Sequence, residues 1–301
     1  MVLVGLAACG RETADPPARL MLPVPPQATG TASSLPAAPP RGSVDLDCDS
    51  GTGFEAAAAD NGASLSQGPW EAFGQVGAGW EIYLPQVAHE IGSGCPPQST
   101  GFARDLATWQ ARSRLAADGR MTPQSFGALI QTWHHRRPFS RVDPANCPPP
   151  PADAELESLS AAEAYGGMEI RLQRGALDAL RRMAATARVE DPSVAADPKA
   201  LKVFSGFRDP VADETRCLTG ASCDGVHRSW CSAHRTGLAV DLYVGAAPGF
   251  GPDSTAEANR LYLSRSPTYR WLVANAARFG FVNYVFEPWH WEWTGAEPTA
   301  P

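Results

Sequence analysis

Two polar clusters in the carboxyl-terminal half constrain the fold of this chain more than any other feature. The first runs Ser232-Ala-His234-Arg-Thr-Gly-Leu-Ala-Val-Asp241, and the second is Glu287-Pro-Trp-His290. A hydrolytic zinc site takes three nitrogen or carboxylate ligands and keeps its fourth position for a water, whose pKa falls to roughly 7. His234, Asp241 and His290 are the expected ligands, so the fold has to bring two distant segments together.

Both clusters adjoin segments that have the character of β-strands. Residues 238–244 are apolar and rich in β-branched side chains, and their alternation places Asp241 on the face opposite the aliphatic residues. Gly237 precedes this strand and suits a turn that needs a positive φ. A second strand is expected over residues 281–287, ending before Pro288.

Hydrolysis also needs a carboxylate that takes the proton from the attacking water and later passes it to the leaving amine. Glu287 is placed for this role because it lies three residues before the expected ligand His290. Trp289, Trp291 and Trp293 surround this segment in the sequence, and we expect their rings to help exclude water.

Each of these residues also has a structural interpretation. An isolated histidine and aspartate seven apart could cap a turn and hydrogen-bond a strand end, but the joint occurrence of ligands, base and arginine favours a metal site. Arg208 alone could be a surface ion-pair partner, and Ser232 could cap a turn. The other histidines show no ligand spacing: they are His89, His134, His135 and His227.

Three motifs together resemble the VanY-type D-alanyl-D-alanine carboxypeptidases, which are zinc peptidases of peptidoglycan. The family pattern runs Ser-Gly-Tyr-Arg, then Ser-x-His-x-x-Gly-x-Ala-x-Asp, then Glu-x-x-His-Trp. This chain carries them, in that order, as Ser205-Gly-Phe207-Arg208, as residues 232–241 and as residues 287–291. The resemblance covers about residues 165–295.

The resemblance implies a role for each matching residue. It implies that His234, Asp241 and His290 bind Zn²⁺, that Glu287 is the general acid and base, and that Arg208 stabilises the oxyanion of the tetrahedral intermediate. The implied contacts to the substrate are Ser232, Ser205 and Trp289.

The segment after Arg208 departs from the family pattern. Family members usually continue Ser-Tyr-x-x-Gln, whereas this chain reads Asp-Pro-Val-Ala-Asp-Glu-Thr-Arg216. The implied activity is release of the terminal D-alanine from a peptidoglycan stem peptide. Two alternatives stay open: an endopeptidase that cleaves inside the stem or cross-link, and a non-catalytic, zinc-containing lipoprotein that binds the cell wall. Another divalent metal could also occupy such a site, although zinc is the default.

Composition excludes some partners and leaves others open. A net charge of −7 and the lack of a basic run argue against nucleic acid as a partner. No apolar stretch is long enough for a spanning helix. The oligomeric state is not indicated.

The amino-terminal segment resembles a bacterial lipoprotein signal. Residues 1–8 are apolar and end Leu-Ala-Ala before Cys9, the expected lipidated residue, with a chance cysteine as the alternative. A positive region is lacking, so we expect the true start upstream of Met1. Gly10 fits delivery to the outer membrane of a Gram-negative cell, which would make the protein a periplasmic lipoprotein of the cell envelope. Residues 9–47 are rich in Pro and Ala and are expected to form an extended tether.

Cysteine usage agrees with export. The chain has seven cysteines, and an even number remains once Cys9 is set aside, which favours disulfides. Three precede Pro148 and three follow Pro210, so full pairing requires at least one bridge between the halves. A structural zinc is the alternative, but no Cys-x-x-Cys pair is present. The six are Cys48, Cys95, Cys147, Cys217, Cys223 and Cys231.

The upstream region, residues 48–140, is expected to be a small helical domain. Residues 101–137 predict two helices, the second with Thr122 as its N-cap and Pro123 at its first position. With the Asp118-Gly turn between them, they resemble a helical peptidoglycan-binding domain, and a plain helical packing module is the alternative. The first half of the region predicts only irregular or β structure.

The remainder is expected to be a Pro-rich linker at 141–155 and a zinc peptidase domain at 156–297. Within that domain, a helix is predicted over 169–188, a strand over 201–204 and a helix that starts at Ser266-Pro and stops at Gly280. The predicted fold class is α+β: a small antiparallel sheet with flanking helices carries the zinc site, preceded by the small helical domain.

Overall fold

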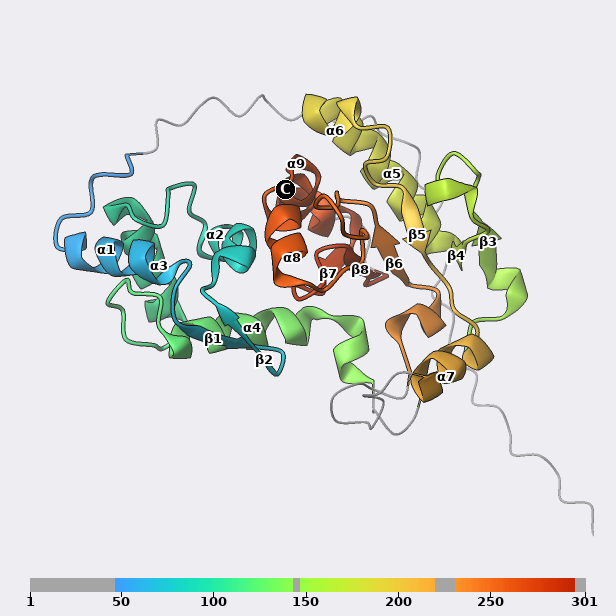
Figure 1. Cartoon of the computed structure of the whole chain (residues 1–301), viewed down its shortest axis with the longest axis horizontal. Coiled ribbons are helices and arrows are strands. Elements are labelled where there is room, and N and C mark those ends of the chain that lie inside the picture. The colour runs from blue at the N-terminus through green and yellow to red at the C-terminus, as the bar shows by residue number, and fades with distance from the viewer. Residues whose placement is uncertain (1–46, 143–146, 220–230, 296–301) are drawn as a thin grey trace, which may run out of the picture. The chain divides into compact units, whose positions relative to one another are not determined.

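The computed structural model describes residues 47–142, 147–219 and 231–295. These residues pack as one compact unit (Figure 1). Cys9, the signal, nearly all of the tether and Cys223 lie outside the described residues. No helix among the described residues has both the length and the apolar character needed to cross a bilayer.

A four-stranded antiparallel sheet organises the carboxyl-terminal half. Asp241 lies opposite His290 in one strand pair and opposite Ser205 in another, so the sheet joins the two polar clusters. The α+β fold predicted from the sequence is confirmed. The strand order is β5 (Val203–Ser205), β6 (Ala239–Leu242), β8 (His290–Trp293) and β7 (Phe281–Asn283).

Helices bury the aliphatic face of this sheet. Val240 and Leu242 of β6 pack in the core with apolar residues of α5 and α9, while Asp241 points to the other face, as its alternation predicts. Ser266 caps α9 by accepting a hydrogen bond from the Tyr269 amide at 3.1 Å, as expected. The helices of this half are α5 (Arg174–Glu190), α6 (Pro192–Ala196), α7 (Pro210–Thr219), α8 (Glu257–Ser264) and α9 (Pro267–Asn275).

Two predicted elements are clearly shorter in the structure, for reasons that the contacts show. The helix expected over 169–188 begins only at Arg174, because Arg171–Gln173 forms strand β4, which pairs with β3 (Leu156–Ser158). The strand expected over 281–287 ends at Asn283. The Asn283 side-chain amide donates to the backbone oxygens of Glu287 and His290, at 3.3 and 2.8 Å, and so turns the chain back into β8.

Short 3₁₀ helices connect these elements. They are η1 (Glu81–Tyr83), η2 (Pro138–Arg141), η3 (Asp153–Glu155), η4 (Tyr165–Gly167), η5 (Ala233–Thr236) and η6 (Ala276–Phe279). The last of them ends at Gly280, whose φ of 79° is the left-handed conformation expected at the end of a helix.

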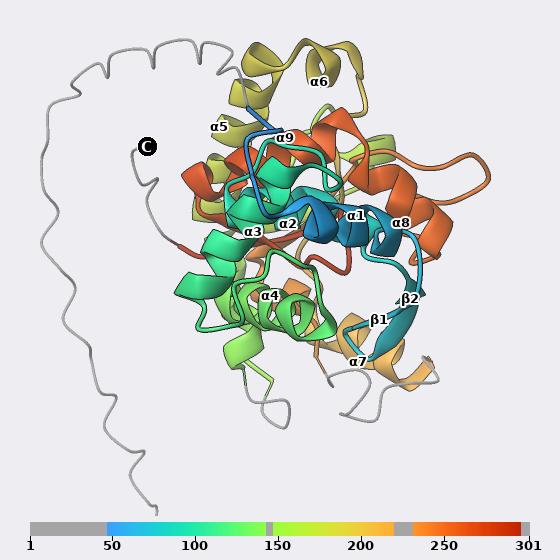
Figure 2. The same ribbon diagram turned by 90° about the vertical axis from the view of Figure 1, so that its left-hand side faces the viewer.

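The upstream region is mainly helical (Figure 2). Its buried apolar side chains form a core of their own. Thr122 caps α4 as predicted, accepting from the Ser125 amide at 3.1 Å. Trp80 stacks on Phe102 with ring centroids 6.0 Å apart. Helices α1 and α2 lie where the sequence predicts only irregular or β structure. The elements are α1 (Glu55–Ser64), β1 (Pro69–Ala72), β2 (Gln75–Ala78), α2 (Leu84–Ile91), α3 (Thr100–Arg112) and α4 (Pro123–Arg136).

The upstream core and the sheet are in direct contact. Gln86 of α2 donates to Asn283 of β7 at 3.1 Å, and Arg260 of α8 donates to the Tyr83 hydroxyl at 2.6 Å. Val285, which follows β7, is buried in the upstream core. The upstream helices therefore pack against the same sheet that carries the two polar clusters.

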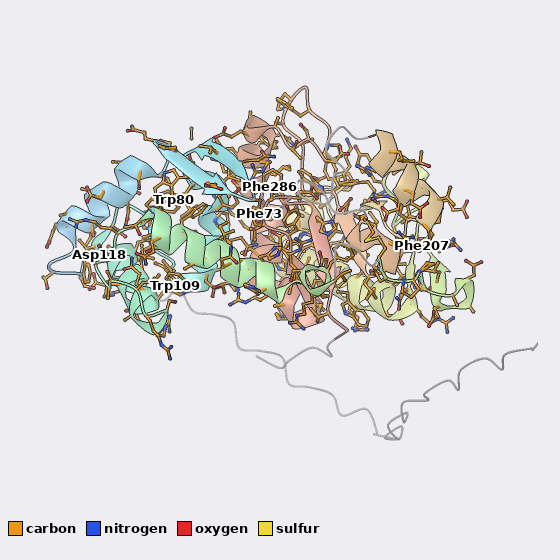
Figure 3. All side chains as sticks on the ribbon, turned by 90° about the horizontal axis from the view of Figure 1, so that it is seen from below. Phe73, Trp80, Trp109, Asp118, Phe207 and Phe286 are labelled. Atoms are coloured by element: carbon orange, nitrogen blue, oxygen red, sulfur yellow. A yellow bond between two sulfur atoms is a disulfide. The ribbon has the colours of Figure 1, made fainter. Side chains whose placement is uncertain are left out.

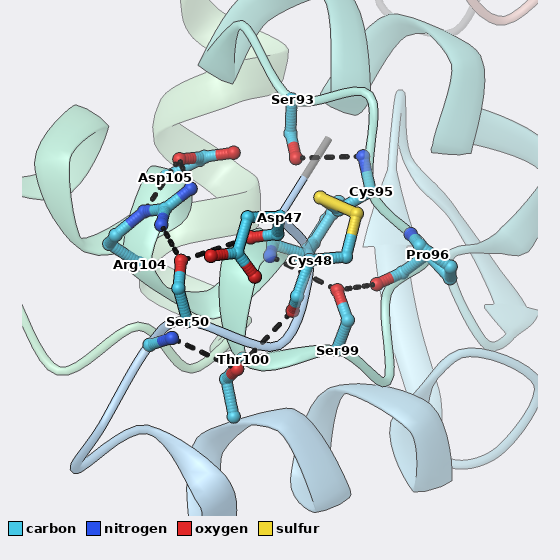
Figure 4. Close-up of a disulfide and its surroundings, with 12 residues drawn as sticks. Asp47, Cys48, Ser50, Ser93, Cys95, Pro96, Ser99, Thr100, Arg104 and Asp105 are labelled. Atoms are coloured by element: carbon cyan, nitrogen blue, oxygen red, sulfur yellow. Dashed lines mark hydrogen bonds and ion pairs between the residues drawn. A yellow bond between two sulfur atoms is a disulfide. The ribbon is translucent and has the colours of Figure 1, made fainter. Parts of the chain in front are cut away.

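Two disulfides are present among the described residues. Cys48–Cys95 joins the segment before α1 to the loop between α2 and α3 (Figure 4). Cys147–Cys231 links the two halves, as full pairing of the cysteines would require, and it ends one residue before Ser232. It therefore anchors the start of the first polar cluster.

We expect loss of the Cys147–Cys231 bridge to destabilise the protein strongly. The bridge closes a loop with a sequence separation of 84 residues, for which chain entropy predicts a loss of roughly 4–5 kcal/mol. Denaturant unfolding of a Cys147→Ser/Cys231→Ser variant measures this loss, with Cys48→Ser/Cys95→Ser as the matched control that leaves the first polar cluster anchored. An unchanged unfolding midpoint would show that the bridge does not constrain the chain.

Candidate metal centre

His234, Asp241 and His290 form a compact buried cluster. One ligand atom from each lies within 4.8 Å of the others. Asp241 lies between the imidazoles: Oδ2 is 3.2 Å from His234 Nε2, and Oδ1 is 2.9 Å from His290 Nδ1. Ligand atoms around a tetrahedral zinc would lie roughly 3.4 Å apart. The two distances to Asp241 are thus close to the separation of ligand atoms around one metal ion, and the whole cluster lies within 4.8 Å.

Local backbone structure positions His234. Ser232 begins the turn η5, where its Oγ accepts from the His234 amide at 3.2 Å. Gly237 ends the turn with a φ of 67°, the positive value expected from the sequence. β6 follows directly and carries Asp241, so turn and strand together set the spacing of the two ligands.

The other nitrogen of each imidazole has an outer partner. His234 Nδ1 lies 2.8 Å from the Gly206 carbonyl oxygen, which fixes a proton on Nδ1 and leaves Nε2 for the metal. His290 Nε2 lies 3.4 Å from Glu292 Oε1, although the two are not aligned as a hydrogen bond. Two imidazole nitrogens and one carboxylate form a donor set that suits zinc.

The cluster is strongly coupled electrostatically. Burial alone would raise the pKa of Asp241, but the adjoining imidazoles of His234 and His290 hold it well below its usual range. Burial alone would lower the pKa of His290, but its contacts with Asp241 and Glu292 raise it to about 10. The Asp241 carboxyl is therefore held in its ionised form, which is the form that binds metal ions.

Glu287 lies in the turn between β7 and β8 rather than at the end of a longer strand. Its amide donates to the Tyr284 oxygen at 2.7 Å, and its own oxygen accepts from the His290 amide at 2.9 Å. The Glu287 carboxylate makes no hydrogen bond or ion pair with any described residue. Burial raises the pKa of this carboxyl, opposed by the charge of His290 and assisted by that of Asp241. A free carboxylate with a raised pKa suits proton transfer.

Arg208 lies beside the cluster on the side of β5. Its amide donates to the His234 oxygen at 3.1 Å, and its Nη2 lies 3.5 Å from Ser205 Oγ. Its Nη1 lies 3.6 Å from Asp213, a buried carboxylate of α7 that also accepts from the Ser232 amide at 2.9 Å. Arg208 therefore links three segments: the loop after β5, helix α7, and the turn η5 that precedes β6.

Trp289 is not among the side chains gathered here. It is 3% exposed and packs in the main core with Trp291. Ser232 and Ser205 do lie beside His234, the former as the cap of its turn and the latter with Oγ 3.5 Å from Nδ1. The ring of Phe207 contacts Arg171, whose guanidinium carbon lies 5.4 Å from the ring centroid.

Sequence reasoning missed several residues around the centre. Glu292 could have been found, because alternation along a strand places it on the same face as His290. Arg137 and Tyr284 gave no such signal: the Arg137 guanidinium stacks 3.9 Å from the Tyr284 ring centroid. The turn between β1 and β2 adds Phe73, which packs against Tyr284 at 5.1 Å and lies beside Phe286 in Figure 3.

Comparisons with known proteins give little beyond this geometry. No protein-family model matches the chain, and no curated protein matches it. Among solved structures, the chain is similar to the LdcB LD-carboxypeptidase, whose structure is described as revealing the molecular basis of peptidoglycan recognition. That similarity has a TM-score of 0.35 and 22% sequence identity, and it covers 48% of this chain and 70% of the other.

Proposed function

We propose that this chain is a zinc-dependent peptidase of peptidoglycan stem peptides that releases the terminal D-alanine. The observation that carries the proposal is the buried cluster of His234, Asp241 and His290, with Glu287 three residues before the last ligand and its carboxylate unpaired among the described residues. The motifs that resemble VanY-type carboxypeptidases supply the substrate class.

The three ligands would hold the metal ion, and the surrounding side chains would have separate roles. His234 Nε2, the Asp241 carboxylate and His290 Nδ1 would hold the ion. When bound, zinc supplies a Lewis acid that polarises the scissile carbonyl and acidifies the attacking water. Burial of all three ligands excludes bulk water from their side of the centre.

Glu287 moves the proton. Its carboxylate accepts a proton as the water oxygen attacks the carbonyl carbon, and it then donates that proton to the nitrogen as the carbon–nitrogen bond breaks. Burial raises the pKa of this carboxyl, so its protonated form is easier to reach than that of an exposed glutamate.

Arg208 supplies positive charge to the oxyanion. Its side chain is 16% exposed and is held by Asp213 at 3.6 Å, which limits the directions in which it can point. A fixed donor costs little reorganisation as charge develops on the carbonyl oxygen. Ser205, next to Arg208 and His234, would help to fix the substrate there.

The bond that is cleaved separates carboxypeptidase from endopeptidase. The segment after Arg208 forms α7, with Asp213 against Arg208, in place of the family's glutamine continuation. Digestion of purified muropeptides followed by mass analysis tests the proposal: loss of one alanine supports it. Internal cleavage would replace it with the endopeptidase, and intact muropeptides with a zinc-loaded protein would indicate a wall-binding role.

We further propose that a lipid on Cys9 anchors the protein in the cell envelope, on the periplasmic side of the outer membrane. The support is the apolar run that ends Leu-Ala-Ala before Cys9 and the Pro-rich residues that follow it. In cells, a Cys9→Ala variant should move from the membrane fraction to the soluble fraction. A variant that stays with the membrane would contradict the lipid anchor.

A further inference from the structure

A buried ion pair reaches the candidate centre from the upstream helical region. Arg137, at the end of α4, donates from Nε and Nη2 to Glu292 Oε1 at 2.9 and 2.5 Å. The Phe139 amide donates to Oε2 of the same carboxylate at 3.0 Å. The side chains of Arg137 and Glu292 are only 11% and 3% exposed. Glu292 is thus held rigidly from its outer side.

The inner side of Glu292 faces His290. The two residues are separated by one position on β8, so their side chains lie on the same face of the sheet. Glu292 Oε1 is 3.4 Å from His290 Nε2, and that nitrogen has no aligned hydrogen bond to any described residue. A lone pair on Nε2 would be repelled by the carboxylate, whereas an N–H is attracted to it. Glu292 therefore favours an N–H on Nε2. Nδ1 lies 2.9 Å from Asp241 Oδ1, and a bound metal ion would take the place of the proton between these two atoms.

Arg137 also bears on His290 through Tyr284. The guanidinium carbon lies 3.9 Å from the centroid of the Tyr284 ring, and that ring meets the His290 imidazole edge-on at 6.1 Å. The imidazole is therefore limited on one side by the carboxylate and on another by the ring, and Arg137 contacts both. A buried ion pair by itself adds little net stability. The consequence of this pair is instead that it restricts the orientation of the His290 imidazole.

We propose that Arg137 and Glu292 are positioning residues of the metal centre. Glu292 selects the tautomer of His290 that presents Nδ1 to the metal, and Arg137 holds Glu292 in place. Outer partners of this kind change metal affinity by about 10–100-fold when they are removed. The inference rests on the proposed function for the identity of the metal, and it makes the upstream helical region part of the centre.

The test is the zinc affinity of folded variants, measured by competition with a chromophoric chelator. Glu292→Gln should weaken zinc binding by about 10–100-fold, and Arg137→Ala should weaken it in the same direction. Arg137→Lys keeps the positive charge and should recover part of the affinity. The absorption spectrum of the cobalt-substituted protein should also change in Glu292→Gln, because the orientation of a ligand changes.

Two further variants separate positioning from folding. Arg137→Gln/Glu292→Gln leaves no unpaired buried charge, so it keeps the fold if the single variant does not, and its zinc affinity should still fall at least about tenfold. Arg136→Ala is the matched control, since Arg136 makes a similar bidentate pair with Glu90, at 2.6 and 2.8 Å, one residue earlier on the same helix. Its zinc affinity should equal that of the wild type.

The outcomes distinguish this inference from the proposed function. If folded Glu292→Gln and the double variant bind zinc within about twofold of the wild type, with unchanged cobalt spectra, the inference is wrong even where the wild type cleaves muropeptides. If the variants lose affinity as expected but the wild type cleaves no muropeptide, the positioning role holds and the peptidase proposal fails.

Discussion

Replacing Glu287 with glutamine should lower kcat for D-alanine release by about 10²–10⁴-fold, the usual contribution of a positioned general base and acid. The amide keeps the size of the side chain but neither accepts the proton of the water nor passes one to the amine. Zinc content should stay at the wild-type level, because Glu287 is not among the clustered ligands. Steady-state kinetics and metal analysis of the same preparation measure both quantities.

Glu190→Gln is the matched control for this prediction. Glu190 is a partly exposed carboxylate that pairs with Arg278 on the surface, at 3.0 Å, and its loss should leave kcat unchanged. A Glu287→Gln protein that holds zinc and releases D-alanine at the wild-type rate would show that another group transfers the proton.

Replacing Asp241 with asparagine should remove zinc binding at ordinary concentrations. Asp241 is the anionic ligand between the two imidazoles, at 3.2 and 2.9 Å. Zinc binding at a full site is worth about 10–16 kcal/mol, so the loss of one ligand should weaken it on the order of 10³-fold. Activity should be lost together with the metal.

Thermal unfolding measures this effect without any substrate. Added zinc should raise the unfolding temperature of the wild-type protein, because a ligand that binds only the folded state stabilises it. It should not raise that of Asp241→Asn at the same concentration. Asp178→Asn, at an exposed position of α5, is the control and should respond to zinc as the wild type does. Equal zinc responses in wild type and Asp241→Asn would exclude Asp241 as a ligand.

The part of the site that was predictable from sequence is the part encoded locally. The alternation around Asp241 predicts which face of β6 it occupies, and Gly237 predicts the turn after His234; the structure confirms both. The helix caps at Thr122 and Ser266 are likewise predicted by the residues next to them in the sequence. Local patterns of polarity and capping therefore predict these elements without information on their tertiary contacts.

The part that was not predictable depends on contacts between distant segments. The strand expected to run through Glu287 stops at Asn283 because a side-chain amide bonds the returning chain. Trp289 was expected near the substrate, but packing against the main core buries it. The pair between Arg137 and Glu292 spans 155 positions, and no periodicity in either segment indicates it.

One measurement tests the central claim most directly: D-alanine release from a pentapeptide ending in D-Ala-D-Ala, by the purified protein, with and without chelator and added zinc. We expect release that the chelator abolishes and that zinc restores, since the proposed chemistry needs the ion held by His234, Asp241 and His290. A protein that holds one zinc ion and releases no D-alanine would contradict the carboxypeptidase.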